Sequence, residues 1–97
     1  MTEPEWNDFK VVLALGRGGS VAGAARILGV DGSTISRRLA AAEEAFGAVL
    51  IVRGGRDFSF TAEGKAALAA GVAMEAAVTA ATAAVRSSKT ELQGIVK

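Results

Sequence analysis

Apolar positions recur along most of this chain with the spacing of amphipathic helices, in which every third or fourth side chain faces the same way. Three such stripes lie in the first half of the sequence: Trp6, Phe9, Val12 and Leu13; Val21, Ala24, Ala25 and Leu28; and Ile35, Leu39, Ala42 and Phe46. The first predicts a helix over 4–15, which Pro4 is suited to begin because proline already has a helical φ. The pattern thus predicts three short helices, with Ala25 at a close crossing of two helices.

The second and third helices are separated by only a few residues, and the residues between them are suited to end one helix and begin the next. Ser20 and Asp31 are good N-caps, because their side-chain oxygens can accept a hydrogen bond from a free backbone N–H. Gly29 can adopt the left-handed conformation that ends a helix. The stretch 20–46 is therefore predicted to be a helix-turn-helix, although a plain helical hairpin is the alternative.

The face of the third helix opposite its apolar stripe is small and polar. Its residues are Ser33, Ser36, Arg37 and Ala40. A solvated helix face more often carries Glu and Lys, whereas a recognition helix needs short side chains near its N-terminus to approach base edges. This face therefore predicts a surface that enters a groove of duplex DNA.

A short β-rich segment follows Gly47. Residues 49–52 are aliphatic and mostly β-branched, 53–57 form a glycine-containing turn, and 58–60 alternate between apolar and polar positions, which predicts a two-stranded hairpin, or wing. Arg53 and Arg56 lie at its base and tip. They are either solvated loop charges or contacts to phosphates and the minor groove, and the wing's position directly after the helix-turn-helix favours the contacts.

Thr61 is suited to cap a last helix that is predicted to run to about residue 86. Small and apolar residues recur there in steps of four and three, as in a coiled-coil seam. They are Ala67, Gly71, Met74, Val78, Ala81 and Val85. We expect this seam to pair two copies of the chain, although packing back on its own domain, through Leu68 and Val72, is the alternative.

The sequence thus predicts three parts: a mainly helical winged helix-turn-helix over 1–61, a dimerisation helix over 62–86, and a hinge with the start of a strand over 87–97. The chain has 97 residues, which is enough for one domain with an appended element.

Composition argues against catalysis. The chain contains no Cys and no His, so it lacks the commonest general base and the commonest metal ligands, and we expect neither a cofactor nor a metal. Glu43 and Glu44 are an adjacent carboxylate pair, but neighbours on a helix point about 100° apart and do not converge. The glycines of 16–19 lack the remaining residues of a nucleotide-binding loop.

Charge and hydropathy bear on the location of the protein and on its partner. The net charge is only +1, which is low for a protein that binds nucleic acid. The start of the chain is acidic and does not resemble a signal peptide. The stretch 66–85 is long enough to cross a membrane, but it consists mostly of Ala, which contributes little to insertion. We therefore expect a cytoplasmic protein without a membrane partner.

The order of these elements resembles the DNA-binding domain of LysR-type transcriptional regulators. The resemblance covers nearly the whole chain and is carried by Trp6-Asn7-Asp8-Phe9, Gly19-Ser20-Val21, Ala24-Ala25, Leu28-Gly29-Val30, the run from Ser33 to Leu39, Glu43-Glu44, Leu50 with Arg53, and Thr61-Ala62-Glu63-Gly64. It implies a homodimer joined through the long helix, with a tetramer as an option in a full-length protein. It also implies that a small-molecule effector would bind only to a C-terminal domain absent from this sequence, whose first strand would begin near Gly94.

The resemblance also assigns residues to DNA contacts: Gly32, Ser33, Thr34, Ser36, Arg37, Arg38, Arg53 and Arg56. It implies that Ser36 and Arg37 meet base edges, that Ser33, Thr34 and Arg38 contact phosphate or the groove wall, and that Arg53 and Arg56 act from the wing.

Some positions depart from the family's usual residues. The family usually has Gln where Gly32 stands, so base readout there is lost or moved to neighbouring positions. Val12, Ala42 and Ile51 are smaller than usual, which predicts a looser core unless Phe46, Phe58 and Phe60 compensate. The alternative function is a winged-helix module that binds proteins and not DNA.

Overall fold

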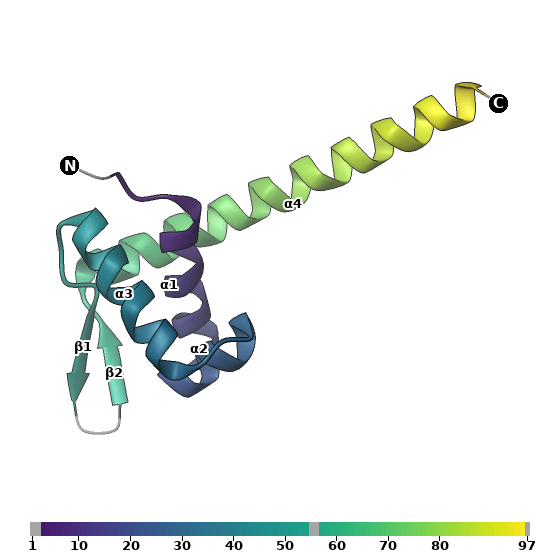
Figure 1. The fold of residues 1–97 in the computed structure, drawn as a ribbon. Coiled ribbons are helices and arrows are strands. Elements are labelled where there is room, and N and C mark those ends of the chain that lie inside the picture. Colours follow the sequence, from purple (N-terminus) through teal and green to yellow (C-terminus); the bar gives the residue numbers. More distant parts are fainter. Residues whose placement is uncertain (1–2, 55–56, 97) are drawn as a thin grey trace.

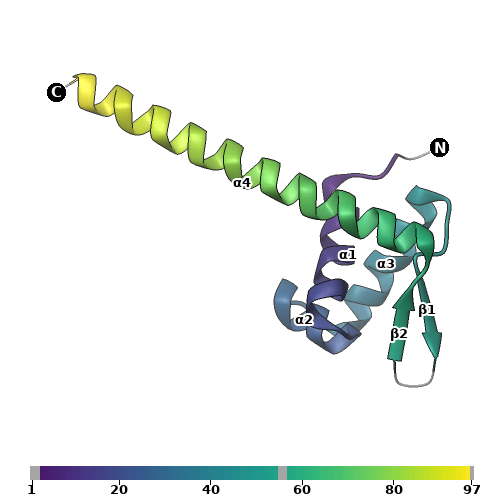
Figure 2. The ribbon, with the colours of Figure 1, turned by 180° about the vertical axis from the view of Figure 1, so that it is seen from behind.

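The computed structural model describes residues 3–54 and 57–96, and within them the chain forms a helical domain with a two-stranded hairpin and one long projecting helix (Figure 1). In chain order the elements are α1 (Trp6–Gly18), α2 (Val21–Leu28), α3 (Gly32–Phe46), β1 (Ile51–Gly54), β2 (Asp57–Phe60) and α4 (Ala62–Val96). The predicted mainly helical winged helix-turn-helix followed by a long helix is confirmed. The molecule is elongated, at 61 × 29 × 20 Å, because much of α4 extends beyond the domain (Figure 2).

Helix α1 lies at the centre of the domain and contacts α2, α3 and α4. The buried residues come from these helices and from the start of the hairpin: Val11, Val12, Ala14, Leu15, Ala24, Ala25, Ile35, Leu39, Ala42, Leu50, Ile51 and Ala67. Phe46, Phe58 and Phe60 are partly buried and pack against this core, so the expected compensation for its small residues stays a prediction. Phe46 also packs edge-to-face on Phe9, with ring centroids 5.2 Å apart.

The first helix is shifted from its predicted bounds at both ends. It begins after Glu5, whose side chain forms a reciprocal capping box with Asp8, and not at Pro4. It continues through Gly16 and Gly18, which were expected to end it, and stops at Gly19, whose φ is 73°. The helix tolerates these glycines because each allows a close neighbour to approach its backbone.

The closest approach of α1 and α2 is made by two glycines. A Cβ atom on Gly23 would overlap the carbonyl group of Gly18, and one on Gly18 would overlap the backbone of Gly23. Ala25 is buried at 8% exposure, but the two backbones meet at the glycine pair. This contact fixes how the first helix of the helix-turn-helix lies on α1.

The turns around α2 and α3 form as the sequence predicts. The Ser20 hydroxyl accepts a hydrogen bond from the Gly23 N–H at 2.9 Å, which caps α2. Gly29 ends α2 with a φ of 68°, and Gly47 ends α3 with a φ of 69°. The helix-turn-helix prediction over 20–46 is therefore confirmed.

The hairpin pairs Ile51 with Phe60 and Gly54 with Asp57, so its first strand begins two residues later than predicted. Its base is anchored on the helices. The Glu43 carboxylate accepts a hydrogen bond from the Leu50 N–H at 2.8 Å. The Thr61 hydroxyl donates to the Val49 carbonyl at 2.7 Å and accepts from the Gly64 N–H at 2.9 Å, which confirms Thr61 as the cap of α4.

Helix α4 corrects the predicted end of the chain. The hinge expected over 87–91 and the strand expected from residue 92 are both absent, because α4 continues to Val96. The physical reason is that this stretch has no proline, and Gly94 is its only residue that costs about 1 kcal/mol in a helix, so nothing in it breaks the backbone hydrogen bonds. Lys97 lies outside the described residues.

Candidate nucleic-acid interface

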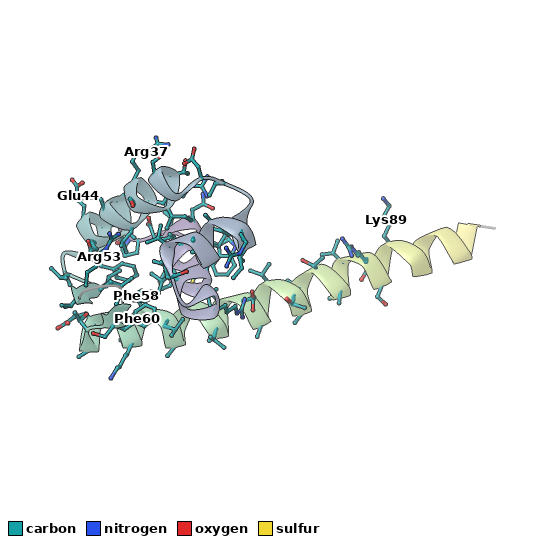
Figure 3. All side chains as sticks on the ribbon, turned by 90° about the horizontal axis from the view of Figure 1, so that it is seen from below. Arg37, Glu44, Arg53, Phe58, Phe60 and Lys89 are labelled. Carbon is teal, nitrogen blue, oxygen red and sulfur yellow. The ribbon has the colours of Figure 1, made fainter. Side chains whose placement is uncertain are left out.

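Helix α3 separates its side chains as a recognition helix requires. Ile35 and Ala42 are fully buried and Leu39 is 8% exposed, so the apolar stripe faces the core. Ser36, Arg37 and Arg38 are exposed on the other side. In Figure 3, Arg37 points away from the body of the domain. Among residues 3–54 and 57–96, no element covers the outward face near the N-terminus of α3.

The first turn of α3 is ordered by Asp31. Its carboxylate accepts a hydrogen bond from the Thr34 N–H at 2.8 Å and one from the Ser33 hydroxyl at 2.9 Å. Hydrogen bonding from Thr34, then from Ser33, together with the nearby positive charge of Arg37, lowers the pKa of Asp31 to about 2. Asp31 is thus ionised at neutral pH. Its role as N-cap was predicted, but its hydrogen bond to the Ser33 hydroxyl was not.

The hydroxyl of Thr34 orients Arg37. It accepts a hydrogen bond from the Arg37 guanidinium (Nη2) at 3.2 Å, one helical turn further along α3. This contact draws Arg37 toward the N-terminal end of the helix, and it uses only part of the five-donor guanidinium. The remaining N–H groups can form a bidentate contact with an acceptor outside the protein.

Two further predicted DNA contacts on α3, Arg38 and Gly32, take no part in the hydrogen bonds between Asp31, Ser33, Thr34 and Arg37. Arg38 lines a shallow groove with Asn7, Asp8 and Ala41, so it faces the α1 side of α3. Gly32 has an ordinary helical φ, and a Cβ there would meet only the Val21 side chain at 3.5 Å. A side chain at position 32 would therefore fit, and glycine is not required by the fold.

The wing places Arg53 on an exposed position opposite Phe58. Alternate residues of a strand share a face, so Arg53 shares one with Ile51, which is buried, while Val52 faces the other way and is 54% exposed. Phe58 and Phe60 pack edge-to-face beside it, with centroids 5.6 Å apart, and Figure 3 shows all three side chains. Arg56 lies outside the described residues, so its predicted contact stays a prediction.

The predicted dimerisation seam is divided by the fold. Ala67 is 4% exposed and Gly71 is buried, with the Leu13 side chain so close that a Cβ on Gly71 would lie 3.1 Å from its Cγ. Gly71 thus packs on α1 and Ala67 belongs to the core of its own domain, so their assignment to the dimer surface is corrected. Met74 is half-buried, whereas the last three positions of the seam, Val78, Ala81 and Val85, are exposed.

The described residues also bear on metal binding, on the pair of Glu43 and Glu44, and on membrane insertion. Residues 3–54 and 57–96 hold no group of three or more acidic, His or Cys side chains that could bind a metal ion. Glu43 is engaged with the Leu50 N–H, while Glu44 is exposed and points away from the domain (Figure 3). The segment Ala62–Lys89 of α4 contains an 18-residue window with a mean hydropathy of 1.6, so it is long and apolar enough to cross a membrane by length and composition alone.

Comparison with known proteins decides the family. The family model described as "bacterial regulatory helix-turn-helix protein, lysR family" matches residues 6–65, which is more than half of the chain. The chain belongs to the lysR family. The match begins with α1 and ends in the first turn of α4, so it contains the whole helix-turn-helix and the wing.

Individual relatives agree with this assignment. The Mau operon transcriptional activator of Paracoccus denitrificans is 49% identical over 45 residues, which are 46% of this chain and 16% of that protein. The CbnR DNA-binding domain, solved in complex with DNA, is 28% identical with a TM-score of 0.78, over 87% of this chain and 97% of that one. Full-length LysG from Corynebacterium glutamicum is 27% identical with a TM-score of 0.74, over 88% and 29%.

The lysR-family chain described here therefore spans about a sixth of its curated relative and less than a third of LysG. Its likeness to a DNA-binding domain, by contrast, extends over nearly the full length of that domain.

Proposed function

We propose that this chain is the DNA-binding part of a sequence-specific transcription regulator. In this proposal α3 enters the major groove, Ser36 and Arg37 meet base edges, and Ser33, Thr34 and Arg38 contact the backbone. The wing, with Arg53 and Arg56, contacts the adjacent backbone or the minor groove. The observation that carries the proposal is the outward face of α3, where Ser36 and Arg37 are exposed above a buried aliphatic underside.

The N-terminal part of α3 supports base recognition. The bond from Arg37 to Thr34 restricts the guanidinium before DNA arrives, so less side-chain entropy is lost on binding. Arginine can contact guanine through two parallel hydrogen bonds, worth about 1–3 kcal/mol of discrimination. Gly32 contributes no side chain, so readout is centred on Ser36 and Arg37. CbnR, whose DNA-binding domain was solved on DNA, supports the same use of this fold.

We also propose that the functional unit is a homodimer paired through the exposed part of α4. Val78 is 46% and Val85 67% exposed, which leaves an apolar face on a helix that has no core of its own beyond the domain. Such a dimer would read two half-sites about one helical turn of DNA, or a multiple, apart. A small-molecule effector would act through a further domain of a longer protein.

The rival function is a winged-helix module that binds proteins and has lost DNA binding. The low net charge favours it, but the exposed Ser36–Arg37 surface and the likeness to a DNA-bound relative favour DNA. Selection of bound sequences from random duplex DNA, followed by titration at several salt concentrations, separates the two. We expect one enriched motif with two half-sites and an affinity that falls steeply with salt. Failure to enrich any sequence, with no duplex binding at low salt, would support the protein-binding module.

A further inference from the structure

Helix α4 leaves the winged domain at a defined place. Its last close contacts are the Leu68 side chain against Gly16, the Gly71 backbone against Leu13, and Glu75 against Arg17. Every residue of α4 from 76 to 89 is exposed. The pair of Arg17 and Glu75 is therefore the outermost of these contacts between the domain and the helix. The far part of α4 projects away from the domain (Figure 2).

The geometry of this ion pair is directional. Two parallel hydrogen bonds join the groups: Arg17 Nη1 donates to Glu75 Oε2 at 2.7 Å, and Arg17 Nη2 donates to Glu75 Oε1 at 2.5 Å. The partners are 58 residues apart, so the pair ties the end of α1 to α4 and is no local helix contact. The planar guanidinium requires both carboxylate oxygens in one plane, which restricts rotation of one helix against the other.

The two inner contacts are apolar and form no hydrogen bonds of this kind. Leu68 meets Gly16, and Leu13 meets Gly71, so in each case a branched aliphatic side chain lies against a bare stretch of helix. Dispersion contacts of this kind hold the helices close, whereas the ion pair adds hydrogen bonds that depend on orientation. The ion pair, with its side chains 49% and 40% exposed, adds little to stability at a surface, but its bidentate form can select one crossing angle.

We propose that Arg17 and Glu75 form a clamp that fixes the direction in which α4 leaves the domain, and thereby sets the half-site spacing that the dimer accepts. The spacing part rests on the proposed function. Both are positioning residues and neither contacts DNA. From Glu75 to Lys89 the helix extends about 21 Å, so a change of about 10° at the clamp moves its far end by about 4 Å. That displacement is comparable to one step of about 3.4 Å along DNA.

The first test measures spacing preference. Duplexes carry two copies of the selected half-site at the preferred spacing or with one base pair added or removed, and the full chain is titrated against each. We expect Arg17→Gln and Glu75→Gln, which change the net charge in opposite directions, both to reduce discrimination between spacings by at least about threefold. Affinity for a single half-site stays within a factor of about two.

The charge-exchanged double variant and a matched control complete this test. Arg17→Glu with Glu75→Arg keeps the composition and can re-form the pair, so we expect it to recover at least half of the lost discrimination. Glu63→Gln removes a carboxylate from the exposed first turn of the same helix and should leave spacing preference unchanged. Unaltered spacing preference in both single variants would overturn the spacing role.

The second test needs no DNA, so it judges the clamp even if the proposed function fails. The chain has no Cys, and Ala22→Cys with Lys89→Cys therefore allows two spin labels, on α2 and on the far part of α4. Measured by pulsed electron spin resonance in an excess of unlabelled chain, the distance distribution within one chain should broaden in Arg17→Gln and narrow again in the charge-exchanged variant. Identical distributions with and without the pair would refute the clamp.

Discussion

Replacing Gly23 with alanine would place a methyl group inside the backbone contact between α1 and α2. The Cβ atom would overlap the carbonyl group of Gly18, and neither partner in this contact is a side chain that could rotate away. The helices must therefore separate, and α2 must shift on α1. Because α2 also packs on α3, the change would disturb the helix-turn-helix itself.

The magnitude follows from two opposing effects. Forcing an extra methyl group into a packed contact costs about 1–3 kcal/mol, and a rigid backbone contact belongs at the upper end of that range. Alanine in place of glycine within a helix returns about 0.8–1 kcal/mol. The net destabilisation is therefore about 2 kcal/mol, which for a domain of this size lowers Tm by about 8–16 °C.

Gly32→Ala is the matched control, because it makes the same chemical change at the start of the neighbouring helix. There the new Cβ would lie 3.5 Å from the Val21 side chain, an ordinary contact, and φ is not left-handed. We expect a gain of about 0.4–1 kcal/mol from the reduced freedom of the unfolded chain. Circular dichroism during heating, at one protein concentration for both variants, measures the difference. A Gly23→Ala variant as stable as Gly32→Ala would refute the close glycine contact.

Two further predictions concern the interface. The lowered pKa of Asp31 contributes stability that is fully present above the ordinary pKa of 3.8 and is lost as pH falls toward about 2. The urea midpoint of the unsubstituted chain should therefore fall across this pH window relative to that of Asp31→Asn. Parallel plots of urea midpoint against pH would contradict the cap network. Arg53→Ala should weaken all duplexes alike and reduce the salt slope by about 1, and a loss confined to one sequence would instead make Arg53 a base-reading residue.

The local elements could be predicted from the sequence because each has a short-range physical signal. Ser20, Asp31 and Thr61 are caps whose oxygens accept backbone bonds three residues away, and Gly29 and Gly47 adopt the positive φ that ends a helix. Such contacts are set by neighbours in the chain, so they can be recognised without knowing the fold.

Contacts between distant elements could not be predicted in the same way. The sequence pattern places Gly18 in a loop and Gly23 inside a helix. The two glycines nevertheless form the closest backbone approach of α1 and α2. The heptad spacing predicts one continuous seam along α4, but Ala67 is buried in the domain core and Gly71 is buried against Leu13 of α1. A heptad spacing shows that residues share a face and does not show which partner covers it.

The site was predicted in part. The exposure of Ser36 and Arg37 above a buried stripe could be inferred from helical periodicity alone. The hydrogen bonds that link Asp31 with Ser33, and Thr34 with Arg37, depend on rotamers that a sequence pattern does not specify. The ion pair between Arg17 and Glu75 joins residues 58 apart, and no motif in the sequence connects them.

The most direct test of the account is a titration of Arg37→Ala against the selected duplex and against duplexes with single base changes, at one fixed salt concentration. Lys89→Ala removes the same charge at the far part of α4 and serves as the control (Figure 3). We predict that Arg37→Ala loses about 1–3 kcal/mol of binding to the selected duplex and no longer distinguishes it from the altered ones, while Lys89→Ala still does. Undiminished affinity and undiminished sequence preference in Arg37→Ala would contradict the assignment of α3 as the recognition helix.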